Sequence, residues 1–350
     1  MMLYPLRFQP LFKRYLWGGR RLGTVLNKPI EGGDDYAESW ELVDHGSDQS
    51  VVANGPLSGK TLAELVHSHG RDLLGRHAPL PRFPLLFKFL DCNRALSVQV
   101  HPNDEQAKQL DPPDLGKTEA WVILAAEPGS VIYAGLKRGI DRAALEREVH
   151  RGTTEPCLHK FEPKVGDCVF IPAGTVHALG AGLVVAEIQQ ASDTTFRLFD
   201  WNRVGPDGKP RQLHVRESLD VIDYSAGPVS PQVPRPTERP YVQRLVECDK
   251  FILDRWTISR RAGSQPVALA SGGRKPPDGT VRMPDSSEGL RPPLADDRFH
   301  ILAVLDGEIR LSGDPSGEPL RKGQTALIPA CLTESVEVAD ESVLLDAYLP

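Results

Sequence analysis

The sequence predicts a mainly β protein with a few short helices, and three observations support this. First, 31 of the 350 residues are glycine and 31 are proline, about 18% of the chain against roughly 12% in an average protein. This excess disfavours a helical bundle and favours strands joined by turns. Second, many short runs are rich in β-branched and aromatic residues and are separated by turn residues. Third, 40% hydrophobic and 25% charged residues are typical of a globular chain with a sizeable core.

Seven of these runs are expected to form strands: Phe83–Leu90, Ala95–Val100, Ala120–Ala125, Ser130–Ala134, Cys168–Pro172, Leu183–Gln189 and Thr195–Trp201. Helices are expected at about 57–77, 103–116 and 141–150. Their candidate N-caps are Ser58, then Asn103 or Asp104, and then Asp141, because short polar side chains accept the free N–H groups of a first helical turn.

The chain is expected to divide at residues 226–240, which contain five prolines in fifteen positions. Such a composition cannot pair within a central sheet and suits an extended connector. We therefore expect one domain over 1–225 and a second over 241–350. Within the second, residues 262–298 are rich in Gly, Pro, Ser and Asp and are predicted to form a long loop.

Charge and cysteine content exclude several classes of protein. A net charge of −6, from 41 basic and 47 acidic residues, gives no electrostatic basis for binding nucleic acid or an anionic membrane. No apolar run is long enough to span a bilayer and no secretory signal is evident, so we expect a cytoplasmic protein. The five cysteines are scattered without a CxxC pair, which argues against disulfides and a thiolate zinc site.

The segment Gly166–His177 (GDCVFIPAGTVH) is the most informative motif. It predicts a strand that ends at Pro172, a tight reversal at Gly174, and His177 at a fixed position on the next strand. This spacing resembles the second signature motif of the cupin superfamily, small β-barrels in which the equivalent histidine is a metal ligand. Taken without its flanking pattern, a lone histidine would more often be structural.

Two further segments carry potential ligands. In Ala95–His101 (ALSVQVH), strict alternation places Ser97, Gln99 and His101 on one face of a strand. An exposed polar face of an antiparallel strand is the alternative interpretation. Glu119 comes directly before the strand Ala120–Ala125. Two imidazoles, a carboxylate and an amide oxygen suit zinc, or another borderline divalent ion, with room left for substrate or water.

A third segment, Val184–Arg203, adds charged side chains to apolar strands. Glu187 shares one face with Val185 and Gln189, and a carboxylate there conflicts with packing unless that face borders a polar cavity. Asp193, Arg197 and Arg203 follow along the chain.

Six motifs occur in an order that resembles the type I mannose-6-phosphate isomerases in their short bacterial form. They are FKFL (Phe87–Leu90), SVQVHPND (Ser97–Asp104), GKTEAW (Gly116–Trp121), PAGTVHALGAG (Pro172–Gly182), QQASDTTFRLFDW (Gln189–Trp201) and LHVRESLDVID (Leu213–Asp223). The resemblance covers residues 4 to 224.

The resemblance implies one zinc ion per chain, with Gln99, His101, Glu119 and His177 as its ligands. It also implies the following active-site residues: Arg197 and the nearby Asp193, the pocket lysines Lys117 and Lys88, and Glu187 as a carboxylate considered as a proton carrier. The implied activity is the interconversion of mannose 6-phosphate and fructose 6-phosphate through an enediol.

That reaction needs a cation to stabilise an oxyanion, a base to carry a proton and an anchor for the phosphate. Zinc and Arg197 are the candidate cations, and Lys117 is a candidate for assisting ring opening. Glu187 is the preferred base, with a metal-bound water as the alternative. Ser97, Lys88 and Arg203 are candidates for the phosphate. The structural alternatives are a strand residue with its head in solvent for Lys88 and a surface turn residue for Arg203.

The segments His300–Leu311 and Gly323–Glu334 repeat the cupin layout, but Cys331 and Glu334 stand where Gly174 and His177 stand in the first copy. We therefore expect two cupin-like, jelly-roll β-barrels in tandem, the second without metal. Two other functions stay open: a non-catalytic sugar-binding or regulatory cupin, and a non-haem iron oxygenase, which also uses two histidines and a carboxylate. The expected partner is a phosphorylated hexose, and the expected state is a monomer or weak homodimer.

Overall fold

The computed structural model describes residues 2–205, 208–258, 293–294, 296–332, 334–338 and 341–350. These residues form a mainly β structure, as the composition predicted. Most of the predicted loop 262–298 lies outside the described residues. No helix among the described residues combines the length and the apolar character needed to cross a membrane.

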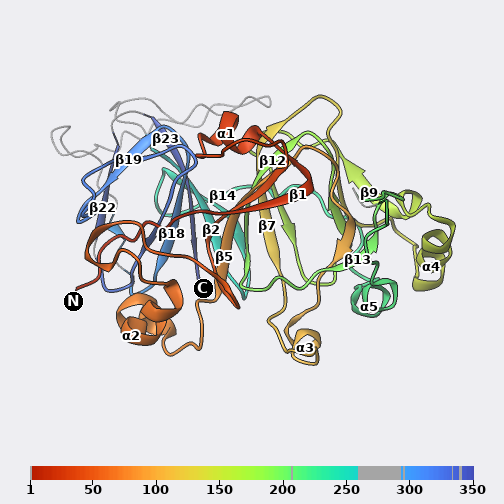
Figure 1. Cartoon of the computed structure of the whole chain (residues 1–350), viewed down its shortest axis with the longest axis horizontal. Coiled ribbons are helices and arrows are strands. Elements are labelled where there is room, and N and C mark those ends of the chain that lie inside the picture. Colours follow the sequence, from red (N-terminus) through yellow and green to blue (C-terminus); the bar gives the residue numbers. More distant parts are fainter. Residues whose placement is uncertain (1, 206–207, 259–292, 295, 333, 339–340) are drawn as a thin grey trace, which may run out of the picture.

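Four antiparallel sheets contain nearly all the strands (Figure 1). The first half has a six-stranded sheet with the order β1 (Leu11–Gly19), β2 (Tyr36–Leu42), β5 (Leu85–Cys92), β12 (Leu183–Gln190), β7 (Glu119–Ala126) and β10 (Cys168–Ile171). A five-stranded sheet follows the order β13 (Phe196–Phe199), β6 (Val98–Val100), β11 (His177–Leu179), β8 (Ile132–Leu136) and β9 (Leu158–Phe161). These strands include all seven that the sequence predicted.

The second half repeats this plan. Its six-stranded sheet has the order β14 (Arg235–Pro236), β15 (Val242–Glu247), β16 (Ile252–Ile258), β23 (Ser342–Tyr348), β18 (His300–Asp306) and β21 (Thr325–Ile328). Its smaller sheet has the order β17 (Pro293–Leu294), β22 (Glu334–Val338), β19 (Glu308–Leu311) and β20 (Leu320–Arg321). The short strands β3 (Asp44–His45) and β4 (Asp48–Gln49) form a separate hairpin.

Side chains alternate between the two faces of each large sheet, so each face packs in a different core. One continuous core joins the two six-stranded sheets, with Phe87 and Ile188 from the first half and Ile301 and Leu345 from the second. The opposite face of each large sheet packs on the smaller sheet of its own half. The alternation predicted for β12 is confirmed, because Val184, Ala186 and Ile188 enter the shared core and leave Glu187 on the other face.

Short helices lie at the periphery: α1 (Arg21–Leu26), α2 (Leu62–Leu74), α3 (Asp104–Ala107), α4 (Arg142–Arg151) and α5 (Val215–Val221). Asp141 caps α4 as predicted, since its side chain accepts from the Ala144 N–H. The cap predicted for α2 is wrong, because Thr61 and not Ser58 forms a reciprocal capping box, with Glu64. The sequence interpretation missed α1 and α5.

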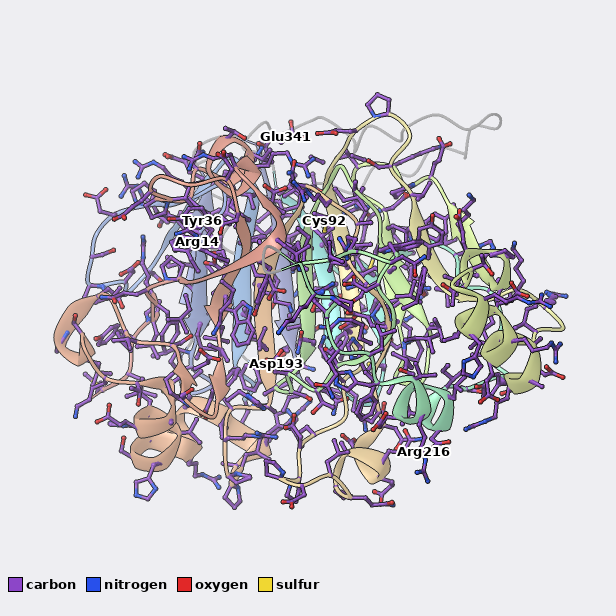
Figure 2. All side chains as sticks on the ribbon, turned by 45° about the vertical axis from the view of Figure 1, so that its right-hand side comes forward. Arg14, Tyr36, Cys92, Asp193, Arg216 and Glu341 are labelled. Atoms are coloured by element: carbon purple, nitrogen blue, oxygen red, sulfur yellow. The ribbon has the colours of Figure 1, made fainter. Side chains whose placement is uncertain are left out.

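Long-range pairing fixes the N-terminal segment on both halves. Leu6 pairs with Leu327 of β21, and β1 runs along β2 with Arg14 opposite Tyr36, two side chains labelled together in Figure 2. In that position β1 is an edge strand of the six-stranded sheet, and its residues Tyr15 and Trp17 line the cavity described next.

Candidate active site

Strand register brings the predicted ligands from distant parts of the chain to one place. In the five-stranded sheet, Gln99 of β6 lies opposite His177 of β11 on one side and Arg197 of β13 on the other. In the six-stranded sheet, Gln189 of β12 lies opposite Glu119 of β7. The facing sheets therefore supply donors to a shared space between them.

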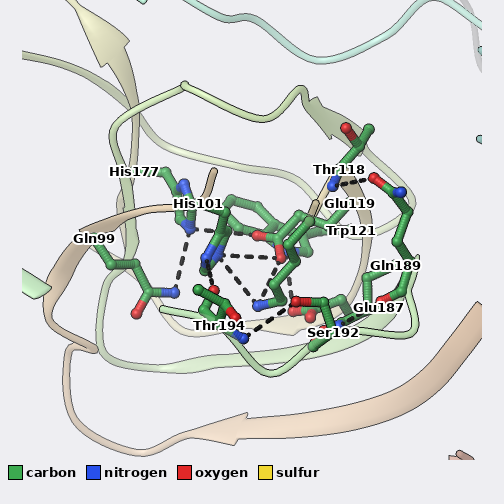
Figure 3. Close-up of polar contacts among 12 residues, drawn as sticks. Gln99, His101, Thr118, Glu119, Trp121, His177, Glu187, Gln189, Ser192 and Thr194 are labelled. Carbon is green, nitrogen blue, oxygen red and sulfur yellow. Dashed lines mark hydrogen bonds and ion pairs between the residues drawn. The ribbon is translucent and has the colours of Figure 1, made fainter. Parts of the chain in front are cut away.

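His101, Glu119 and His177 form a buried cluster whose ligand atoms all lie within 4.8 Å of one another (Figure 3). The Nε2 atoms of His101 and His177 lie 3.5 and 3.3 Å from the Glu119 carboxylate, and each side chain is only 1% exposed. Within the part of the chain that the structure describes, this is the one cluster of His, Cys, Asp or Glu with metal-ligand spacing.

Both imidazoles are held in the orientation that metal binding requires. The Nδ1 atom of His101 lies 2.9 Å from the Thr194 carbonyl, and that of His177 lies 2.9 Å from the Thr175 carbonyl. Donation from Nδ1–H leaves each Nε2 lone pair directed at the cluster. Burial lowers the pKa of His177 to about 4 and holds the pKa of His101 well below its usual range. Both rings are therefore neutral near pH 7, as metal ligands must be.

The donor set fits a divalent cation. Glu119 Oε2 is buried and makes no hydrogen bond of good geometry, although Lys117 Nζ lies 3.1 Å from it. The Gln99 carboxamide nitrogen lies 3.2 Å from His177 Nε2. The two ends of an amide are assigned from such contacts, and a half-turn presents the Gln99 oxygen to the same point. Two imidazoles, one carboxylate and one amide oxygen are ligands that zinc accepts.

A cavity of about 280 Å³ opens beside the cluster. Eight of the eleven predicted site residues line it: Lys88, Ser97, Gln99, Lys117, His177, Glu187, Asp193 and Arg197. His101 and Glu119 lie beneath this lining, almost fully buried. Asp193 is on the exposed loop between β12 and β13 (Figure 2). The structure thus brings together all the predicted residues except Arg203.

Lys88 lies between two carboxylates rather than in solvent. Its Nζ is 3.2 Å from Glu38 Oε2 and 3.2 Å from Glu187 Oε1, and the side chain is 7% exposed. Burial alone would lower the pKa of Lys88, but Glu187 and Glu38 outweigh it and raise that pKa above its ordinary value. The Lys88 charge is therefore already engaged, which disfavours its predicted role as a phosphate ligand.

Glu187 faces the cavity, as its position in an apolar strand predicted. Trp121 Nε1 donates to its Oε2 at 3.1 Å, and Lys88 is its ionic partner. Burial raises the pKa of Glu187, and Lys88 opposes that rise. A carboxylate with a raised pKa in a cavity is suited to carrying a proton near neutral pH.

Two arginines meet at the other wall of the cavity. Arg197 Nη1 donates to the Gln212 carbonyl at 2.8 Å, and its buried Nε makes no hydrogen bond. Arg211 binds Asp200 through two contacts of 2.6 and 2.7 Å. Burial and the nearby charge of Arg211 lower the pKa of Arg197. Two adjacent guanidinium groups at a cavity wall form a site that favours an anion.

Arg203 is the prediction that the structure does not support. Its Nη1 donates to the Ala95 carbonyl at 2.5 Å, its Nη2 pairs with Asp200, and it does not line the cavity. It supports a turn, as the structural alternative proposed.

Sequence reasoning missed Arg211, Glu38 and the stacked pair Tyr15 and Trp17, all of which line the cavity. Arg211 lies in an irregular segment that folds back, since His214 N–H donates to the Arg197 carbonyl. No local pattern marks such a residue. Glu38 could have been considered, because it is one of two carboxylates, with Glu41, in the run Tyr36–Leu42, but nothing in that run separates the two.

Comparison with known proteins agrees with this geometry. The model of the phosphomannose isomerase type I catalytic domain matches residues 5–120. Mannose-6-phosphate isomerase ManA of Bacillus subtilis (strain 168) is 35% identical over 338 residues, 95% of this chain and 96% of the relative. The mannose-6-phosphate isomerase of Streptococcus mutans is 31% identical over 328 residues, 94% of this chain and 93% of the relative.

The same relationship is found among solved structures. The crystal structure of the mannose 6-phosphate isomerase from Bacillus subtilis superposes with a TM-score of 0.82 at 28% identity, covering 99% of this chain and all of that one. Shared sequence over nearly the whole length and a shared fold confirm the relationship that the six motifs indicated. The chain belongs to the type I mannose-6-phosphate isomerases, a family of isomerases.

Proposed function

We propose that this chain interconverts mannose 6-phosphate and fructose 6-phosphate by a proton transfer between C1 and C2 through an enediol. One observation carries the proposal: the buried His101, Glu119 and His177 cluster adjoins a cavity that also holds two arginines and a carboxylate with a raised pKa. These groups match the three needs of the reaction, namely a cation, an anion anchor and a base.

We infer that Gln99, His101, Glu119 and His177 hold one zinc ion per chain. When bound, zinc supplies a positive charge that polarises a sugar oxygen. The chain's own contribution is to keep both histidines neutral and oriented through the Thr194 and Thr175 carbonyls.

The proposed proton carrier is Glu187, which is held by Trp121 and Lys88 at the cavity wall. Ionised, it accepts the proton from one carbon, and protonated, it returns that proton to the neighbouring carbon. Lys117, buried beside His101 and Glu119, is proposed to donate to a sugar oxygen during ring opening. Asp193 adds a second carboxylate that can accept hydrogen bonds from sugar hydroxyls.

We propose that the phosphate is anchored by Arg211 and Ser97 at the wall where Arg211 meets Arg197, with Asp200 holding the Arg211 guanidinium in place. Arg197, which lines the same cavity, is proposed to stabilise the oxyanion that develops at the reacting carbons. Of the three residues predicted as phosphate ligands, only Ser97 keeps that role, because Lys88 is held between two carboxylates and Arg203 does not line the cavity.

The two halves are proposed to be tandem cupin-like, jelly-roll barrels over residues 1–225 and 241–350, with 226–240 as connector. Each half has one six-stranded sheet facing a smaller sheet, which supports this view. The strand pairs β10–β11 and β21–β22 also stand at corresponding places in the repeated motif. The location in the cytoplasm and the oligomeric state, a monomer or weak homodimer, stay predictions.

A coupled isomerase assay with purified protein tests the function. We expect conversion of mannose 6-phosphate to fructose 6-phosphate together with about one equivalent of zinc per chain. Binding of mannose 6-phosphate without conversion would favour the sugar-binding alternative. Bound iron with oxygen consumption would favour the oxygenase.

A further inference from the structure

A network outside the cavity converges on one carboxylate, Asp114. Its Oδ2 accepts from Ser192 Oγ at 2.8 Å and from Thr194 Oγ1 at 2.9 Å. Its Oδ1 accepts from Arg82 Nη2 at 2.9 Å and from the Leu115 N–H at 2.8 Å. His45 Nε2 lies 3.3 Å from both oxygens. Asp114 therefore connects three distant segments of the chain to its own and is not among the residues that line the cavity.

The segment that Asp114 holds is the one that orients a metal-site histidine. Thr194 donates its hydroxyl to Asp114 and accepts from His101 Nδ1 through its carbonyl, 2.9 Å away. Ser192 reinforces this arrangement, because its Oγ also accepts from the Thr194 N–H at 3.2 Å, a contact drawn in Figure 3. Thr194 thus connects Asp114 directly to the ring of His101.

We propose that Asp114 is a positioning residue for the metal centre: through Ser192 and Thr194 it fixes the carbonyl that holds His101 with Nε2 directed at the cluster. The inference rests on the proposed metal site and adds a residue that neither binds the ion nor touches the cavity. The same loop carries Asp193 and Thr195, which line the cavity. Asp114 therefore also determines where that wall of the cavity lies.

The chemistry of the network requires a carboxylate at position 114. Donors approach both oxygens, two on each side, and a carboxylate accepts on both. An amide accepts on one oxygen only and would direct N–H groups at the donors on its other side. Asp114→Asn therefore keeps the size of the side chain but breaks either the pair with Arg82 and Leu115 or the pair with Ser192 and Thr194.

The test is Zn²⁺ affinity, measured by competition with a chromophoric chelator, so that it does not depend on activity. We expect Asp114→Asn to weaken Zn²⁺ binding about 10-fold, the lower end of the range for residues behind a ligand, because the Thr194 carbonyl remains in the chain. Thr194→Val, which removes only the hydroxyl donor, should weaken binding in the same direction. Thr194→Ser, which keeps the hydroxyl, should bind as the wild type does.

Asp314→Asn is the matched control. Asp314 also accepts from an arginine, an amide and a backbone N–H, but in the second half of the chain. The Asp314→Asn variant should have a lower melting temperature than the wild type and an unchanged Zn²⁺ affinity. Wild-type Zn²⁺ affinity in both Asp114→Asn and Thr194→Val would overturn the inference. If Asp114→Asn does not fold, the comparison of Thr194→Val with Thr194→Ser tests the inference instead. A wild-type chain that binds no Zn²⁺ would instead overturn the proposed metal centre, and this inference with it.

Discussion

Replacing Lys88 by methionine should make the proposed base, Glu187, active only at higher pH. Lys88 is the cation nearest to Glu187 in this cavity, and it favours the ionised carboxylate, whereas burial favours the protonated one. Methionine is similar in length and carries no charge. Its introduction removes the larger of the two cationic influences on Glu187 and leaves only Lys117 to oppose burial, so the pKa of that carboxyl rises. A general base works only when ionised. As the pH falls, the Lys88→Met variant should therefore lose activity at a higher pH than the wild type does.

The size of the effect follows from the 3.2 Å separation of Lys88 Nζ and Glu187 Oε1. With an effective dielectric constant of about 20, two unit charges at that distance attract by about 5 kcal/mol. This energy is an upper bound on the effect of removing Lys88. Water entering beside the methionine and rearrangement of Glu38 reduce this effect. We therefore expect the acidic limb of the activity profile to move upward by at least about one pH unit.

The assay is kcat/KM as a function of pH, which reports the essential base of the free enzyme. The midpoint of the acidic limb should rise in Lys88→Met. Lys28→Met is the matched control, because Lys28 forms a comparably buried pair with Glu41, 2.5 Å away, and is not among the cavity residues. An unchanged acidic limb would refute the reasoning about Glu187. A higher KM at every pH with no change in the limb would instead support phosphate binding by Lys88.

Three further predictions concern the cation, the metal and stability. Arg197→Ala should lower kcat by about two to three orders of magnitude, as loss of an oxyanion donor does, and normal turnover would contradict its role. Chelation should abolish activity in the isomerase assay and added Zn²⁺ should restore it, whereas a metal-free chain with full activity would exclude a role for the metal in the reaction. His300 is buried between Asp346 at 2.9 Å and Asp296 at 3.1 Å, and these carboxylates raise its pKa to about 9 although burial alone would lower it. Burial also raises the pKa of Asp346, but because two carboxylates face one imidazole we expect the protonated ring to dominate. The His300 contribution is thus complete below about pH 6.5 and is lost as pH rises through about 9, so the free energy of unfolding should fall by up to about 3 kcal/mol over that range. Denaturation followed by circular dichroism should show this fall in the wild type and not in His300→Gln.

Local patterns in the sequence determined much of the fold and the positions of several candidate site residues. Strict alternation in β12 was enough to place Glu187 on the face that points away from the core shared by the two large sheets, because side-chain direction in a strand repeats every two residues. The spacing of Gly166, Pro172, Gly174 and His177 specified a strand, a turn and the place of a candidate metal ligand, all within twelve residues. Asp141 could be identified as a cap for the same reason, since its partner lies three residues away.

The tertiary structure alone decided which cations face the cavity. Lys88 and Arg203 looked equally available along the chain, yet one is held by Glu38, fifty residues earlier, and the other by Asp200 and the Ala95 carbonyl. Arg211, in an irregular segment, replaces Arg203 at the cavity wall. Whether a charged side chain is free to meet a substrate depends on partners that approach from distant segments. No periodicity or spacing in the sequence encodes those partners, because they are chosen only when the sheets pack.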